Sequence, residues 1–240
     1  MKNLKDLLKN YKGKKILMVF PHPDDEAYVS GGLLQIAQKY SIKTKLICMT
    51  KGGRGLMPKN LEKAELIKKV REEELEKASK ILGIDEKVVW DYPDSGLIQT
   101  QTHWYSLLKR EIIKSDASIV VTFDYTGITG HPDHLILSSE VFNILSKLKT
   151  KPKLLFRVPD KQEQIYFREN KALIFFRKPT HILRCSFRQS INKIRAIFAH
   201  KSQIKNFIFR LHLIDWYVID QKELYYLVDY KKQNRLKLSN

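Results

Sequence analysis

The sequence predicts an α/β fold with a mostly parallel sheet, in a Rossmann-like three-layer α/β/α arrangement. The first observation is a set of short apolar runs rich in β-branched and aromatic residues, such as Lys15–Phe20 (KILMVF). Such runs are typical of parallel strands buried on both faces. The second is that a longer segment of mixed apolar and polar residues, typical of a helix, follows most of these runs. Glycine, proline and aspartate gather where the runs end, which indicates turns.

The first 150 residues divide into strands and helices in alternation. An amphipathic helix to about Tyr11 comes first, and Gly13 separates it from the first strand. The segment Leu61–Leu82 is charged with apolar residues at helical spacing, and Gly83 is a usual helix end. The expected strands are Lys15–Phe20, 44–49, 88–92 and 118–123, and the other expected helices are 25–40, 102–114 and 131–148.

From about residue 151 the sequence becomes richer in residues that favour β-structure. No repeat and no Gly/Ser linker interrupts it, so we expect one domain over residues 1–240 whose later part caps the sheet and shapes the substrate pocket. The polar basic end, residues 231–240, is expected to fray. The expected elements are strands at 153–158, 182–185 and 224–228, a helix at 187–198, and two further β-favouring runs at 165–167 and 172–176.

Length and composition fit a single soluble domain. The chain has 240 residues, of which 43% are hydrophobic and 29% charged. No run approaches the ~20 apolar residues of a membrane span, and the N-terminus lacks an apolar signal core, so a cytoplasmic protein is expected. Cys48 and Cys185 are too few for a disulfide framework, and neither belongs to a CxxC pair, which argues against zinc ligation by cysteine.

The formal net charge of +18 favours an anionic partner. The lysines are dispersed, and aromatic residues are not interleaved with them in an RNA-binding pattern, which argues against nucleic acid. An anionic small-molecule substrate and an anionic lipid surface both fit the charge. The composition does not choose between them.

Two short turns concentrate the residues that can hold a metal. Residues 20–26 read FPHPDDE and residues 130–134 read GHPDH, and each turn follows an expected buried strand. The carboxyl ends of neighbouring parallel strands meet at one edge of the sheet, where α/β proteins build their sites. We therefore expect the two turns to converge, although they are far apart in the sequence.

The chemistry of these side chains predicts a hydrolytic metal site. Imidazole and carboxylate are zinc ligands, and three protein ligands with an open fourth position are typical of catalytic zinc. Such a metal turns water into a nucleophile near neutral pH, and a carboxylate beside it can act as general base. A two-His, one-carboxylate set also binds iron(II). Either turn alone is ordinary helix-start composition, and spacing does not tell Asp24 from Asp25 in these roles.

The two turns resemble the paired motifs of the PIG-L/LmbE-like family of zinc-dependent N-acetylglucosaminide deacetylases. Residues 21–26 match the family's PHPDDE motif and residues 131–134 its HPDH motif. Three weaker matches follow in the family order, so the resemblance covers about residues 13–205. They are residues 71–83 (REEELEKASKILG), 94–97 (DSGL) and 200–203 (HKSQ).

The resemblance implies a role for each residue of the paired motifs. His22, Asp25 and His134 would hold the metal. Asp24 would be the general base that takes a proton from the metal-bound water. His131 would be the general acid, and its positive charge would stabilise the tetrahedral oxyanion.

The resemblance also implies substrate contacts from Arg71 and Asp94. Asp94 follows an expected strand, where it can accept hydrogen bonds from sugar hydroxyls. Thr129 stands where some members carry a tyrosine, so an oxyanion role is not expected there. The loop at residues 50–55 (TKGGRG) lacks the ending of a P-loop, and it is either a substrate-facing loop or a flexible turn.

The expected reaction is metal-assisted removal of an N-acetyl group from a GlcNAc-containing small molecule, with zinc favoured and iron(II) as the other metal. The Gly-x-Gly-x-x-Gly fingerprint is missing, so dinucleotide binding is not expected. One alternative is a metal hydrolase for another N-acyl amide or an ester. The other is a basic binding module with a structural metal, which would need a fourth protein ligand. The candidates for that ligand are His103, His181, His200 and His212.

Overall fold

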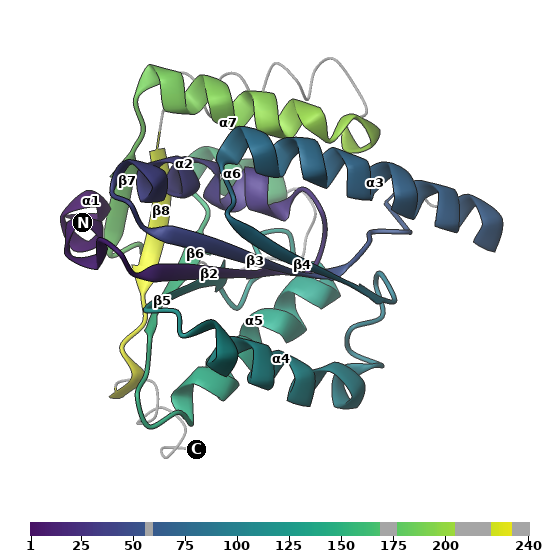
Figure 1. Ribbon diagram of the computed structural model, residues 1–240, viewed down its shortest axis with the longest axis horizontal. Helices are drawn as coiled ribbons and strands as arrows, with labels where there is room; N and C mark the ends of the chain where they lie inside the picture. Colours follow the sequence, from purple (N-terminus) through teal and green to yellow (C-terminus); the bar gives the residue numbers. More distant parts are fainter. Residues whose placement is uncertain (56–59, 169–176, 205–221, 232–240) are drawn as a thin grey trace.

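The structure is a computed structural model that describes residues 1–55, 60–168, 177–204 and 222–231 (Figure 1). The described strands form one eight-stranded sheet. They are β1 (Lys2–Asn3), β2 (Lys15–Phe20), β3 (Lys43–Thr50), β4 (Glu86–Tyr92), β5 (Ile119–Phe123), β6 (Lys153–Val158), β7 (His181–Arg184) and β8 (Lys222–Leu227). Their order across the sheet is β1-β7-β8-β6-β5-β2-β3-β4. All neighbours pair in parallel except β8, which runs antiparallel to both β6 and β7.

Helices cover both faces of this sheet, as Figure 1 shows. The helices are α1 (Leu4–Leu8), α2 (Asp25–Lys39), α3 (Leu61–Leu82), α4 (Gln101–Ser115), α5 (Pro132–Ser146), α6 (Lys161–Arg168) and α7 (Phe187–Ala199). One apolar cluster lies between the sheet and α2, α3 and α7, and a second lies between the sheet and α4 and α5. The predicted three-layer α/β/α fold is confirmed. Across the described ranges, no helix combines the length and the apolar character that crossing a membrane requires.

The central pair of strands, β2 and β5, positions the candidate site. They are parallel neighbours, with Ile16 opposite Ile119 and Met18 opposite Val121. All five residues of β5 and five of the six residues of β2 are buried, as their apolar composition predicts. Because both strands end at the same edge, the turns that follow them lie side by side.

Two local predictions differ from the structure. The run at residues 165–167, which favours β-structure, belongs to helix α6. Asp160 and Glu163 explain this, because each carboxylate accepts a 2.8 Å hydrogen bond from the other residue's backbone N–H and so nucleates the helix. At the N-terminus, the helix to Tyr11 is α1 followed by a 3₁₀ turn, Lys9–Tyr11, and the short strand β1 precedes it. The runs at 172–176 and 232–240 lie outside the described residues.

Candidate metal centre and active site

The turn after β2 presents the first half of the site. Asp24 has φ 109° and ψ −30°, a conformation that few residues other than glycine adopt, and it begins helix α2 without a side-chain cap. Asp25 Oδ2 accepts a 2.9 Å hydrogen bond from the backbone N–H of His22, which folds the Asp25 carboxylate back toward the imidazole. Backbone strain of this kind is held in place by its surroundings and clusters at functional sites.

The start of α5 presents the second half. His131 caps the helix, Pro132 occupies its first turn, and His134 points inward from that turn. The ring of His134 stacks on Phe123 at 4.1 Å between centroids, and its Nδ1 lies 2.9 Å from the carbonyl oxygen of Gly127. A carbonyl oxygen only accepts, so Nδ1 carries the proton and Nε2 is left to face the site.

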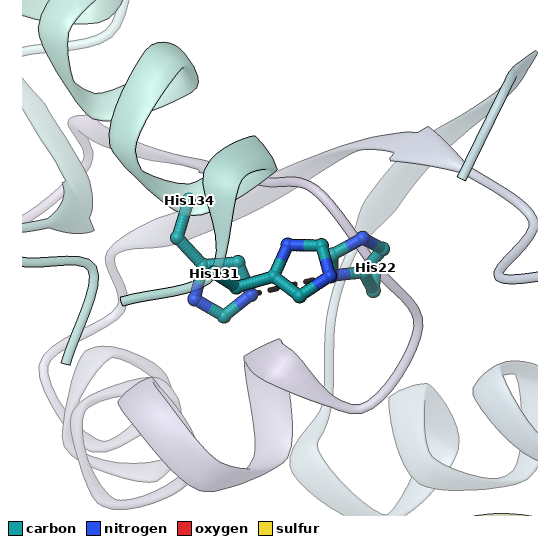
Figure 2. A group of neighbouring side chains, drawn as sticks. All are labelled: His22, His131 and His134. Atoms are coloured by element: carbon teal, nitrogen blue, oxygen red, sulfur yellow. Dashed lines mark hydrogen bonds between the residues drawn. The ribbon is translucent and has the colours of Figure 1, made fainter. Parts of the chain in front are cut away.

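The two halves converge. Figure 2 shows the rings of His22, His131 and His134 gathered where the loop after β2 meets the start of α5. His22 Nδ1 lies 3.3 Å from His134 Nε2. Through its two oxygens, the Asp25 carboxylate lies 3.7 Å from each of these nitrogens. The three predicted metal ligands are therefore mutual neighbours.

These distances fit a divalent cation. Ligand atoms around a tetrahedral zinc ion, with bonds of about 2.0–2.2 Å, lie about 3.3–3.6 Å apart. Among the described residues, His22 Nδ1 and His134 Nε2 make polar contacts with each other and with the Asp25 carboxylate. Either a proton or a cation can therefore lie between the two nitrogens. In the described part of the chain, His131 also lies within ligand reach of His22 and His134. His103, His181 and His200 do not join a metal-binding cluster there, and His212 lies outside the described residues.

Asp133 orients His22, a role that the sequence pattern alone does not predict. Its carboxylate is fully buried and accepts backbone N–H bonds from Ser95 at 2.7 Å and Leu97 at 3.0 Å. Its Oδ2 also lies 3.2 Å from His22 Nε2, which leaves Nδ1 to face the site. This is the carboxylate–histidine arrangement that fixes the tautomer of a metal ligand. The only sequence signal was the position of Asp133 next to His134 in the second motif.

Asp94 lies on the same side of His22. Its Oδ1 is 3.2 Å from His22 Nε2, and its Oδ2 accepts a 2.8 Å bond from the backbone N–H of Arg54. Burial acts to raise the pKa of Asp94, but the bonds from His22 and Arg54 outweigh it and hold the pKa below its usual range. Both oxygens therefore have protein partners. The predicted contact between Asp94 and a sugar stays a prediction.

Arg71 reaches the site from α3 but lies beneath its loops. The side chain is 3% exposed, and the guanidinium donates to the carbonyl oxygens of Gly52 and Pro23. Its Nη2 is also 3.5 Å from Asp24 Oδ1. A Cβ on Gly52 or Gly55 would come within 2.4 Å of this guanidinium, so the glycine loop is shaped by the close approach of Arg71. The predicted substrate contact of Arg71 stays a prediction.

The ring centroid of His131 lies 4.7 Å from that of His22, and Asp24 directly precedes the predicted ligand Asp25. Burial raises the pKa of Asp24, against the opposing effect of Arg71, which suits a group that must take up a proton. His131 Nδ1 accepts a 3.2 Å bond from the backbone N–H of Asp133, so Nε2 is the nitrogen that carries the proton. Burial and the neighbouring His22 lower the pKa of His131. At neutral pH we therefore expect a neutral His131 in the metal-free chain, where the resemblance implied a charged one.

Metal binding is expected to release protons and to strengthen as pH rises. Burial would lower the pKa of His22, but hydrogen bonds with Asp133 and Asp94 raise it to about 10. Burial and the adjacent Asp24 raise the pKa of Asp25. Both ligands therefore hold a proton that a cation must displace near pH 7. We expect the Co²⁺ or Zn²⁺ affinity to rise at least about tenfold per pH unit between pH 6 and 8, with one to two protons released per ion, measured by calorimetry in buffers of different ionisation enthalpy. A pH-independent affinity would contradict this.

Comparisons with known proteins agree with the motifs. The family model described as "PIG-L: GlcNAc-PI de-N-acetylase" matches residues 17–145. The chain is 24% identical to a "Probable N-acetyl-alpha-D-glucosaminyl L-malate deacetylase 2" of Bacillus anthracis, over 92% of this chain and 98% of the relative. It is 29% identical to a "Probable N-acetylglucosaminyl-phosphatidylinositol de-N-acetylase" of Schizosaccharomyces pombe, over 51% of this chain and 48% of the relative. A solved structure of the N,N'-diacetylchitobiose deacetylase from Pyrococcus horikoshii superposes with a TM-score of 0.71 at 20% identity, covering 92% of this chain and 85% of that chain.

Proposed function

The chain belongs to the PIG-L family of GlcNAc-PI de-N-acetylases, and from that membership we propose that it removes the N-acetyl group from a GlcNAc-containing substrate. The reaction adds water across the amide and yields acetate and a free amine. One observation carries the proposal: two inward-facing ring nitrogens 3.3 Å apart, one carboxylate 3.7 Å from each, and a second carboxylate, that of Asp24, on the adjacent residue. The named relatives act on GlcNAc joined to malate, to phosphatidylinositol or to a second GlcNAc.

His22, Asp25 and His134 are the residues that would hold the metal. When bound, a divalent cation would polarise the amide carbonyl and lower the pKa of a water molecule. Two neutral imidazoles and one carboxylate suit zinc, and they also suit iron(II). Asp133 holds His22 through Nε2, so Nδ1 is the nitrogen that would bind the ion. The carbonyl oxygen of Gly127 holds His134 through Nδ1–H, so Nε2 would bind it there.

Asp24 and His131 would move the protons. Asp24 is held beside the ligands by the turn that begins α2, where its raised pKa lets the carboxylate take a proton from the attacking water. To act as the general acid, the His131 ring must first be protonated; it would then give its Nε2 proton to the amide nitrogen as the C–N bond breaks and return to the neutral ring, whose Nδ1 accepts the backbone N–H of Asp133. Asp24 would pass the proton that it took from water to the free amine, and the acetic acid formed would return a proton to His131. The amine then leaves protonated, and acetate retains both oxygens.

We propose further that the substrate carries an anionic group. The chain has a net charge of +18, and Arg54 belongs to the loop that contacts Asp94 at the site. The backbone of Arg54 is bonded to Asp94, which in turn contacts His22. The Arg54 side chain is exposed and forms no ion pair with the rest of the described chain. An arginine fork there would bind a carboxylate or phosphate on the aglycone.

The test is release of free amine by the zinc-loaded protein from N-acetylglucosaminides that differ in the aglycone. The set includes malate and inositol-phosphate conjugates as anions and N,N'-diacetylchitobiose as a neutral compound. We expect turnover of an anionic member with a kcat/KM at least about tenfold above that of the neutral one. No amine from any compound, with a folded and metal-loaded protein, would refute the deacetylase and favour another N-acyl substrate or a structural metal.

Arg54→Gln separates the anion preference from catalysis. We expect kcat/KM for the anionic substrate to fall about tenfold, because the charge-assisted bond is lost, while that for the neutral compound stays unchanged. Arg110→Gln is the matched control, since Arg110 is also exposed but lies on α4 away from the site. An equal loss on both substrates would assign Arg54 to the general shape of the loop instead.

A further inference from the structure

The turn that presents Asp24 and Asp25 depends on a contact from the far end of the chain. A backbone with φ 109° does not persist on its own in an aspartate, so its neighbours must hold it. The N–H of Asp24 donates a 3.0 Å hydrogen bond to Glu26 Oε2. This bond closes the turn over the start of α2 and fixes where the Asp24 side chain begins.

The Glu26 carboxylate has a second partner, His200, from the end of α7. Glu26 Oε1 lies 2.8 Å from His200 Nε2, and the two side chains are 1% and 0% exposed. The same carboxylate therefore bonds a turn in the first motif and a histidine 174 residues later. A buried carboxylate needs such partners, because without them its charge is costly.

His200 is itself firmly anchored. Its backbone N–H bonds the carbonyl oxygen of Ile197 at the end of α7, and its carbonyl oxygen accepts from Gln203. The next turn is tied to α3, because the N–H and hydroxyl of Ser202 donate to Glu74 at 2.7 and 2.6 Å. The segment 200–203 thus contacts both α3 and the start of α2. Through the Glu26 carboxylate it is linked by hydrogen bonds to the backbone N–H of Asp24.

We propose that His200 is a positioning residue that acts through Glu26 to hold the Asp24 turn in its catalytic conformation. His200 touches neither the three metal ligands nor the space between them by any contact in the described chain. Removing its Nε2 leaves the Glu26 carboxylate with one partner fewer in a buried place, so the carboxylate reorients and its bond to the Asp24 N–H weakens. The general base then shifts, while His22, Asp25 and His134 keep their own contacts. The proposal rests on the proposed function only for the statement that Asp24 is the base.

The first test measures the turn itself and needs no substrate. Hydrogen–deuterium exchange of residues 22–27 is compared in the metal-loaded wild-type protein, His200→Leu and His200→Gln. We expect exchange there to be at least about tenfold faster in the leucine variant and near wild type in the glutamine variant, whose amide nitrogen can replace Nε2. His181→Leu is the matched control, a buried histidine on β7 whose Nδ1 contacts Thr180.

Unchanged exchange at residues 22–27 in His200→Leu would overturn the proposal. So would equal increases in His200→Leu and His181→Leu, or no recovery with glutamine, because each would indicate a general packing effect. If His200→Leu does not fold, Glu26→Leu replaces it, because leucine has no oxygen that can accept the N–H of Asp24 or bond His200. The same local increase is then expected, and its absence contradicts the proposal.

The second test uses catalysis with whichever N-acetylglucosaminide is turned over. We expect kcat of His200→Leu to fall about 10–100-fold, the loss that a displacement of about 1 Å brings, with KM within twofold and one metal ion still bound. His200→Gln should recover most of the rate. A rise in KM with normal kcat would contradict positioning of the base. If no compound is turned over, the proposed function fails, whereas the exchange result still decides whether His200 holds the turn.

Discussion

Replacing Asp24 with asparagine is expected to reduce turnover by about 10²–10⁴-fold while the metal stays bound, because a general base contributes about that much to the rate. The amide has nearly the same shape but cannot take up the proton of the attacking water. Asparagine tolerates positive φ as aspartate does, so the turn with φ 109° is expected to persist. His22, Asp25 and His134 do not depend on the Asp24 side chain for their mutual distances.

The measurement combines kcat from amine release with metal content from elemental analysis. Asp116→Asn is the matched control: Asp116 also has positive φ, 47°, but it ends α4 far from the metal ligands. Normal turnover in Asp24→Asn would remove the base role from Asp24. Loss of metal together with loss of folding would favour the structural-metal alternative, in which this turn is a scaffold and catalyses nothing.

Much of the fold was predictable because its central strands, such as β2 and β5, are buried on both faces. The apolar run of β2 was predicted with the bounds that the structure has, Lys15–Phe20, and β5 differs by one residue. Helix α3, bounded by Asn60 and Gly83, was also predicted as found, since its cap residues act locally. The direction of β8 was not predictable, because whether a strand runs parallel or antiparallel depends on partners far away in the chain.

The site divides in the same way. The residues that approach the cation position lie in two motifs, and the parallel pairing of β2 and β5 brings those motifs together, so their convergence followed from the sequence. The supporting contacts did not follow. Asp133 is held in place to orient His22 because the loop after β4 supplies the N–H groups of Ser95 and Leu97. Arg71 can approach the glycine loop closely because Gly52 has no side chain that would collide with the guanidinium. Each of these contacts needs three segments that are far apart in the sequence to come together, so no local sequence pattern predicts it.

The proposed ligand role of His134 is tested by the difference between His134→Ala and His131→Ala. Both histidines lie within ligand reach of His22, so their distance from His22 does not tell which one binds the ion. The hydrogen bonds that their Nδ1 atoms make do distinguish them. His134 Nδ1 donates to the Gly127 carbonyl oxygen and commits Nε2 to the site, 3.3 Å from His22 Nδ1. Burial and His22 also hold the pKa of His134 well below its usual range, so the ring is neutral and ready to bind a cation.

We therefore expect His134→Ala to weaken Zn²⁺ or Co²⁺ binding by more than about 100-fold, beyond the loss typical of a residue that only supports a ligand, and to abolish turnover. His131→Ala should bind the ion with an affinity within a few-fold of wild type and lose only turnover. In the wild-type protein, His131 Nδ1 accepts the backbone N–H of Asp133, and its Nε2 is proposed to face the substrate. His103→Ala, on the exposed side of α4, is the control for losing any histidine. The reverse pattern, with the metal lost from His131→Ala and kept by His134→Ala, would place the ion between His22 and His131. The proton delivered to the leaving amine would then have to come from another group.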